Sequence, residues 1–141
     1  MYKLTSCNNV FVYLLFLSTL MLVSCGKVPC LEDIYGTWEG ELQGKELIFK
    51  FKNDKTCELK TKYKISESVE KVNGNFEMDF SKKPITLSIR NIPQLNHPLF
   101  TIIEFVNADS MRLANFAPSW RLRPIAFSNT SMNLKCIKKG M

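Results

Sequence analysis

A tryptophan beside two arginines is the group in this sequence whose chemistry best suits ligand binding. Trp120, Arg121 and Arg123 lie in one irregular stretch. Arg90 directly precedes an earlier irregular stretch, 91–98, and His97 lies within it. Guanidinium groups can hold a carboxylate or phosphate head while an indole ring packs on an apolar tail. The alternative is structural: Trp120 plugs the end of the fold, and the arginines satisfy loop carbonyls. The sequence leaves both interpretations open.

Catalytic chemistry has little support. His97 is the single histidine and lies between Asn96 and Pro98, where a hydrogen bond within the loop is a more typical role than general base. It has no clear Ser, Cys or carboxylate partner, and no glycine-rich phosphate loop is present. The cysteines and His97 do not have metal-ligand spacing. We therefore expect no enzymatic activity, no cofactor and no metal site.

The stretch Leu22-Val23-Ser24-Cys25 resembles the lipobox of bacterial lipoproteins. Lys3 precedes an apolar run over 10–23 that is too short to span a membrane, as in a signal peptide. The resemblance implies that residues 1–24 are removed and that Cys25 is acylated with fatty acids such as palmitate. It places the protein in the bacterial cell envelope, anchored by lipid and expected at the outer membrane. The alternative is an ordinary signal peptide followed by a structural cysteine.

Three regions follow from this division of the 141 residues: a signal peptide over 1–24, a lipidated tether over 25–33 and one domain over 34–141. The whole chain carries 19 basic and 13 acidic residues, a net charge of +6. No nucleic-acid-binding motif accompanies this charge, and we expect no nucleic-acid partner. A basic outer strip, predicted either as a solvated face or as an attraction for lipid headgroups or an acidic protein, contains Lys50, Lys52, Lys60, Lys62 and Lys64.

Apolar and polar residues alternate with period two in most of eight short segments, which predicts strands over 37–42, 47–52, 57–65, 76–80, 85–90, 99–106, 110–116 and 131–137. The segment 99–106 is apolar on both faces, which suggests a cover on its outer side. Together they predict an all-β fold, an eight-stranded antiparallel up-and-down barrel. Its inward aromatic rings, numerous enough to fill the interior, are Trp38, Phe49, Phe51, Tyr63, Phe76 and Phe80.

Two sequence features are similar to lipocalins. Gly36-Thr37-Trp38 looks like their Gly-x-Trp signature on the first strand, and the run 116–124, ending in Arg123-Pro124, is similar to small bacterial lipocalin-like lipoproteins. The resemblance implies a calycin barrel that binds small apolar or amphipathic molecules. Lipocalins usually stack an arginine across the tryptophan. The cations available here are Lys135, Lys138 and Lys139.

Connection lengths predict two different barrel ends. The short connections are 53–55, 81–84 and 107–109, and the long ones are 66–75, 91–98 and 117–130. Alternate connections lie at opposite ends of an up-and-down barrel, so the long set forms a candidate mouth, facing away from the lipid anchor. Cys30 and Cys136 would lie at the other end on adjacent strands. We predict a disulfide between them and a buried free thiol at Cys57.

The leading functional hypothesis is a lipid-anchored, lipocalin-like envelope protein that binds a small apolar or amphipathic ligand at the long-loop end. The predicted ligand-binding residues are Trp120, Arg121, Arg123, His97 and Arg90. The alternative is a protein-binding module or inhibitor that uses the long loops as its contact surface, because Trp and Arg are enriched at interface hot spots. An open pocket favours the first hypothesis, and a filled barrel with projecting loops favours the second.

Overall fold

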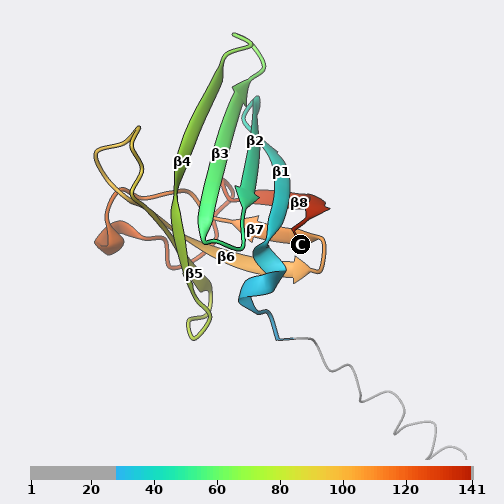
Figure 1. Ribbon diagram of the computed structural model, residues 1–141, viewed down its shortest axis with the longest axis vertical. Coiled ribbons are helices and arrows are strands. Elements are labelled where there is room, and N and C mark those ends of the chain that lie inside the picture. The colour runs from blue at the N-terminus through green and yellow to red at the C-terminus, as the bar shows by residue number, and fades with distance from the viewer. Residues whose placement is uncertain (1–27, 141) are drawn as a thin grey trace, which may run out of the picture.

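Eight strands follow one another in chain order around a closed antiparallel barrel in this computed structural model, which describes residues 28–140 (Figure 1). The strands are β1 (Gly36–Leu42), β2 (Lys45–Phe51), β3 (Thr56–Tyr63), β4 (Val69–Asp79), β5 (Ile85–Arg90), β6 (Leu99–Asn107), β7 (Ser110–Leu113) and β8 (Met132–Lys139). The predicted fold class is confirmed. The predicted signal peptide and the predicted acylation site Cys25 lie outside the described residues, among which no helix is long and apolar enough to cross a membrane.

One predicted connection is wrong. The segment 66–75 was expected to be a long polar loop, but β4 begins at Val69 and pairs with β3 up to Asn75. Lys62 faces Val69 across this pair, so β3 and β4 form a long hairpin that rises above the barrel (Figure 1). The hairpin is exposed on both faces at this level, and it therefore lacks the apolar alternation that marks a half-buried strand.

The barrel is strongly sheared, so its connections do not separate cleanly into two ends. In Figure 1, β1–β4 run along the long axis and β6–β8 cross them at a steep angle. Asn75 of β4 faces Thr56 of β3 on one side and Arg90 of β5 on the other. A surface hollow of about 360 Å³ is consequently lined both by the β2–β3 turn, at Asp54, and by the start of the 91–98 loop, at Pro93.

The interior is packed with side chains. Trp38, Phe49 and Phe51 are at most 1% exposed, and Phe76 packs edge to face on Phe51 with ring centroids 5.0 Å apart. Leucine, isoleucine and methionine side chains complete the same cluster. Four of the six predicted inward rings are therefore in the core, and Phe80 is half-buried at its edge.

The sixth ring, Tyr63, was predicted to point inward, and this prediction is wrong. Its hydroxyl donates a 3.0 Å hydrogen bond to Glu70, and Lys45 Nζ lies 4.9 Å from its ring centroid. Both contacts are at the surface because this part of the β3–β4 hairpin extends beyond the closed ring of strands. Period two assigns a residue to a face, but it does not show how far along the strand the barrel continues.

The Gly36-Thr37-Trp38 signature closes one end of the barrel. The 3₁₀ helix η2 (Leu31–Ile34) precedes β1, and Trp38 Nε1 donates a 2.7 Å hydrogen bond to the carbonyl of Ile34. Lys139 Nζ lies 4.9 Å from the Trp38 ring centroid, so one of the three candidate lysines does lie over the ring. Gly36 has φ +137°, and a Cβ there would lie 2.3 Å from the Lys138 carbonyl oxygen.

The predicted Cys30–Cys136 disulfide is not present in the structure, where Cys30, Cys57 and Cys136 are free thiols. Cys30 precedes η2 and directs its Sγ to Asp33 Oδ2, 3.3 Å away. Cys136 lies within β8, opposite Trp38, and packs against the barrel core. Cys57 is buried as predicted, and burial raises the pKa of its thiol to about 12.

Candidate functional site

The outer face of β6 is covered, as its apolar character predicted. Phe100 and Ile102 point outward from the barrel but are only 3% and 2% exposed. The segment after β7 continues beside β6 in the same sheet, where Ala117 exchanges backbone hydrogen bonds of 2.8 and 2.9 Å with Phe100. The long β7–β8 connection therefore begins as an extension of the barrel wall.

Arg123 attaches a later part of this connection to the outer face of β5. Its Nη2 donates a 2.7 Å hydrogen bond to Ser88 Oγ on β5, and its guanidinium carbon lies 5.2 Å from the Phe100 ring centroid. Arg90 reaches the same ring at 5.5 Å. Ser88 faces Phe100 across the β5–β6 pair, so the two arginines and the serine converge on one aromatic ring.

The electrostatics of this cluster indicate a structural role for Arg123. Burial lowers the pKa of the Arg123 guanidinium from its usual value, and the neighbouring Arg90 charge lowers it further. Arg123 Nε is buried and has no hydrogen-bond partner within the described residues. A buried donor without a partner carries a desolvation cost, so contact with Phe100 and the Ser88 hydrogen bond must offset it.

Several residues on either side of Arg123 project into solvent. The single 3₁₀ turn η3 (Trp120–Leu122) begins after Ser119, whose side chain accepts a hydrogen bond from the Arg121 amide. Trp120 and Leu122 are each 67% exposed, and Ile125 is 89% exposed. The interpretation of Trp120 as a barrel plug is therefore wrong. We call the exposed segment formed by Trp120, Arg121, Leu122 and Ile125 the apolar tip.

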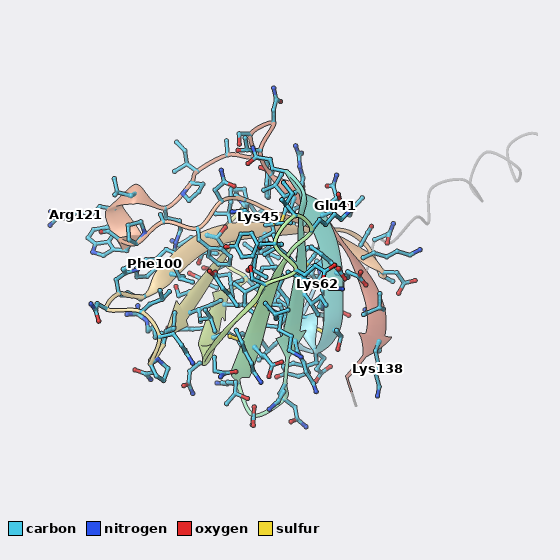
Figure 2. The ribbon with its side chains drawn as sticks, turned by 90° about the horizontal axis from the view of Figure 1, so that it is seen from above. Glu41, Lys45, Lys62, Phe100, Arg121 and Lys138 are labelled. Carbon is cyan, nitrogen blue, oxygen red and sulfur yellow. The ribbon has the colours of Figure 1, made fainter. Side chains whose placement is uncertain are left out.

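Arg121 belongs to the tip. Its guanidinium carbon lies 5.5 Å from the Trp120 ring centroid, so the two side chains present a cation beside an exposed indole. In Figure 2, Arg121 and Lys138 lie at opposite sides of the molecule. Lys138 is near the end of β8. The apolar tip therefore points away from the end of the barrel where β1 begins and β8 ends.

His97 and Arg90 lie elsewhere, along the β5–β6 loop. Both line a hollow of about 570 Å³ together with Ile92, Pro93, Leu95 and Pro98. His97 Nδ1 donates a 3.0 Å hydrogen bond to the Pro98 carbonyl, as expected of a loop residue. The five predicted ligand-binding residues are thus divided: Arg90 and His97 at this hollow, Arg90 and Arg123 on Phe100, and Trp120 and Arg121 at the tip. Their binding of a ligand stays a prediction.

The predicted basic strip is largely neutralised. Lys62 pairs with Glu46 at 3.1 Å, and Lys64 pairs with Glu41 at 2.6 Å. Lys60 and Lys71 both pair with Glu58. These ion pairs offset the charges of Lys60, Lys62 and Lys64, three of the five lysines of the strip, which favours the interpretation of a solvated face.

Sequence reasoning missed Leu122, Ile125 and Ser88. The first two lie in an irregular run bounded by prolines, where no periodicity separates an exposed apolar residue from a buried one. Ser88 is a polar residue within the predicted strand 85–90, and the sequence does not indicate which segment returns to contact it. Within residues 28–140, no group of three or more His, Cys, Asp and Glu side chains is arranged to hold a metal ion.

Comparisons with protein-family models, with curated proteins and with solved structures give no match for this chain. The barrel is consistent with a lipocalin-like fold through its strand order, and the Gly36 and Trp38 motif adds to this.

Proposed function

We propose that this protein is a protein-binding module of the bacterial cell envelope, in which a filled β-barrel presents the apolar tip to a partner. The observation that carries the proposal is the exposure of Trp120, Leu122 and Ile125 within six residues of chain whose base is fastened by Arg123 to Ser88. Exposed apolar side chains that lie together on one loop often mark an interaction surface, whereas single exposed apolar residues are common and carry no such meaning.

The filled interior supports a partner over an interior ligand. Trp38, Phe49 and Phe51 occupy the space that a lipocalin-type cavity would need. A loop held at both sides loses less conformational entropy when it binds, because its base is already ordered. Tryptophan and arginine are also the side chains that most often carry binding energy at protein interfaces.

The tip defines the chemistry of its partner. Trp120, Leu122 and Ile125 require an apolar recess, and Arg121 requires a carboxylate at its rim. A protein surface with a hydrophobic groove bordered by Asp or Glu satisfies both requirements. The tip lies far from Lys138, so it would be accessible to such a partner on the side away from the tether (Figure 2).

Photo-crosslinking in intact bacteria tests the proposal. A photoreactive amino acid at position 125 should give one protein adduct, and Trp120→Ala or Arg121→Glu in the same chain should abolish it. The matched control is position 65, because Ile65 is an equally exposed apolar residue, 99% accessible, at the β3–β4 turn. Equal crosslinking from positions 125 and 65, or crosslinking to lipid alone, would contradict the proposal.

The envelope anchor is the second part of the proposal, and its support is the lipobox ending at Cys25. Growth with an alkyne analogue of palmitate should label the full chain, and Cys25→Ala should remove the label. Cys30→Ala is the matched control, because Cys30 is the next cysteine in the chain and lies at the start of η2. Label that persists in Cys25→Ala would show that the anchor is wrongly assigned.

A small amphipathic ligand is the second candidate function, favoured by the hollow that Arg90 and His97 line. Its apolar walls and single guanidinium suit an anion with an apolar tail. Fatty acids should then raise the melting temperature of the protein, and Arg90→Gln should remove that increase. A screen of fatty acids, lipids and haem without any thermal shift would count against this candidate.

A further inference from the structure

A second apolar hollow lies at the tether end of the barrel. Its volume is about 590 Å³, and it lies between the first described residues, the β4–β5 turn and the end of β6. Apolar side chains line most of it, contributed by Val28, Pro29, Phe80, Pro84, Ile85 and Phe105. This hollow is separate from the apolar tip and from the hollow at Arg90 and His97.

The hollow is apolar because partly buried side chains that border the core reach the surface here. Ile85 and Phe105 belong to the inward-facing rows of β5 and β6, and Phe80 directly follows β4, yet each is only partly buried. Phe105 contacts the buried Trp38 ring on its inner side, with ring centroids 6.1 Å apart. The core therefore continues to the surface at this end, and Val28, 82% exposed, extends the apolar surface outward.

Two cations border the hollow. Lys82 and Lys83 both line it from the β4–β5 turn and are exposed. Glu104 also lines it, so the rim carries two positive charges against one negative charge. The ion pairs described above engage the lysines of β3 and β4 and leave Lys82 and Lys83 outside them.

An apolar hollow with a cationic rim matches a lipid whose head is anionic. We propose that this hollow receives an acyl chain of an anionic phospholipid of the bilayer, with Lys82 and Lys83 on its phosphate. The bilayer is favoured over a free fatty acid because Val28 and Pro29 belong to the tether. Val28 is three positions from Cys25 in the chain, a reach of about 10 Å when extended, and this step rests on the proposed anchor.

Vesicle flotation tests the site without depending on acylation. Residues 26–141 contain the whole ring of strands, whose core cluster spans Leu31 to Cys136, so this part carries the complete barrel. Circular dichroism and urea unfolding would verify its fold. It should float with vesicles of equal parts phosphatidylcholine and phosphatidylglycerol but not with phosphatidylcholine alone.

Substitutions at the rim distinguish this site from general basic attraction. Lys82→Gln with Lys83→Gln should weaken vesicle binding about 30-fold. Val28→Asp, at an exposed position that should tolerate it, should also abolish binding. The matched control is Lys62→Gln with Lys64→Gln, which removes the same charge from β3 and its turn and should change binding less than about threefold.

Four outcomes would overturn the assignment. The first is an absence of binding to the mixed vesicles, and the second is an equal loss in the two double-lysine variants. The third is binding of dissolved laurate in calorimetry without any binding to vesicles, which would assign the hollow to a free fatty acid. Finally, loss of flotation in Trp120→Ala would move the membrane contact to the apolar tip. Retained flotation in that variant separates this site from the proposed partner surface.

Discussion

Arg123 Nη2 donates a 2.7 Å hydrogen bond to Ser88 Oγ, and this bond joins the β7–β8 connection to the outer face of β5. The two residues are 35 positions apart in the chain. Phe100 lies beneath the guanidinium, so the contact combines a hydrogen bond with a cation–π interaction. This attachment fixes the base of the apolar tip to the barrel wall.

Ser88→Ala should loosen this attachment. Without the hydroxyl, Arg123 loses the acceptor of Nη2 while its Nε is already buried without a partner, so the free energy of unfolding should fall by about 1 to 3 kcal/mol. Urea unfolding measures the loss, and hydrogen exchange of residues 117–125 should become faster. Ser66→Ala, at an exposed position of the β3–β4 turn, is the control and should change neither quantity. Unchanged exchange in Ser88→Ala would mean that the bond does not hold the tip.

Replacement by phenylalanine should strongly reduce stability at one tryptophan and have almost no effect at the other. Trp38→Phe removes the donor to the Ile34 carbonyl and shrinks a fully buried side chain, so it should destabilise the protein by about 2 to 4 kcal/mol. Trp120→Phe, at a position that is 67% exposed, should change stability by less than about 0.5 kcal/mol. Urea unfolding of the two variants provides the comparison. Similar losses would contradict the assignment of Trp120 to the surface.

The buried Cys57 thiol should make stability depend on pH in the alkaline range. Its pKa is raised from 9.0 to about 12, so the folded protein keeps this proton after the unfolded chain has lost it. The stabilising effect is complete below pH 9 and is lost as the pH rises toward 12. The difference in unfolding free energy between the wild type and Cys57→Ala should fall by about 1 kcal/mol per pH unit above 9. A difference that stays constant with pH would show that the thiol is accessible to water.

Much of the barrel could be predicted because its strands have one wet and one buried face. Residues 57–62 alternate strictly, and β3 forms there. The start of β4 could not be predicted in this way, because Val69, Glu70 and Lys71 are all exposed and Val72 is only half-buried. Alternation reports burial on one face, and a hairpin that extends beyond the barrel has no buried face.

The candidate site was harder to predict because it depends on tilt and on a returning segment. The apolar outer face of β6 indicated a cover, and Arg123 of the β7–β8 connection supplies part of it over the Phe100 ring. The sequence does not indicate which residues of the β7–β8 connection face the barrel. Arg123 turns toward the wall, whereas Trp120 turns away from it. The shear that brings Asp54 beside Pro93 also cannot be read from connection lengths.

The affinity of the barrel for the protein captured from position 125 is the measurement that tests the central claim most directly. Trp120→Ala and Ile125→Ala should each weaken this affinity substantially, by about 30-fold for Trp120, because an interface hot spot is lost. Ile65→Ala, at a residue that is just as exposed, should leave the affinity unchanged. Equal effects at positions 65 and 120, or no effect at either, would contradict the account that the apolar tip is the binding surface.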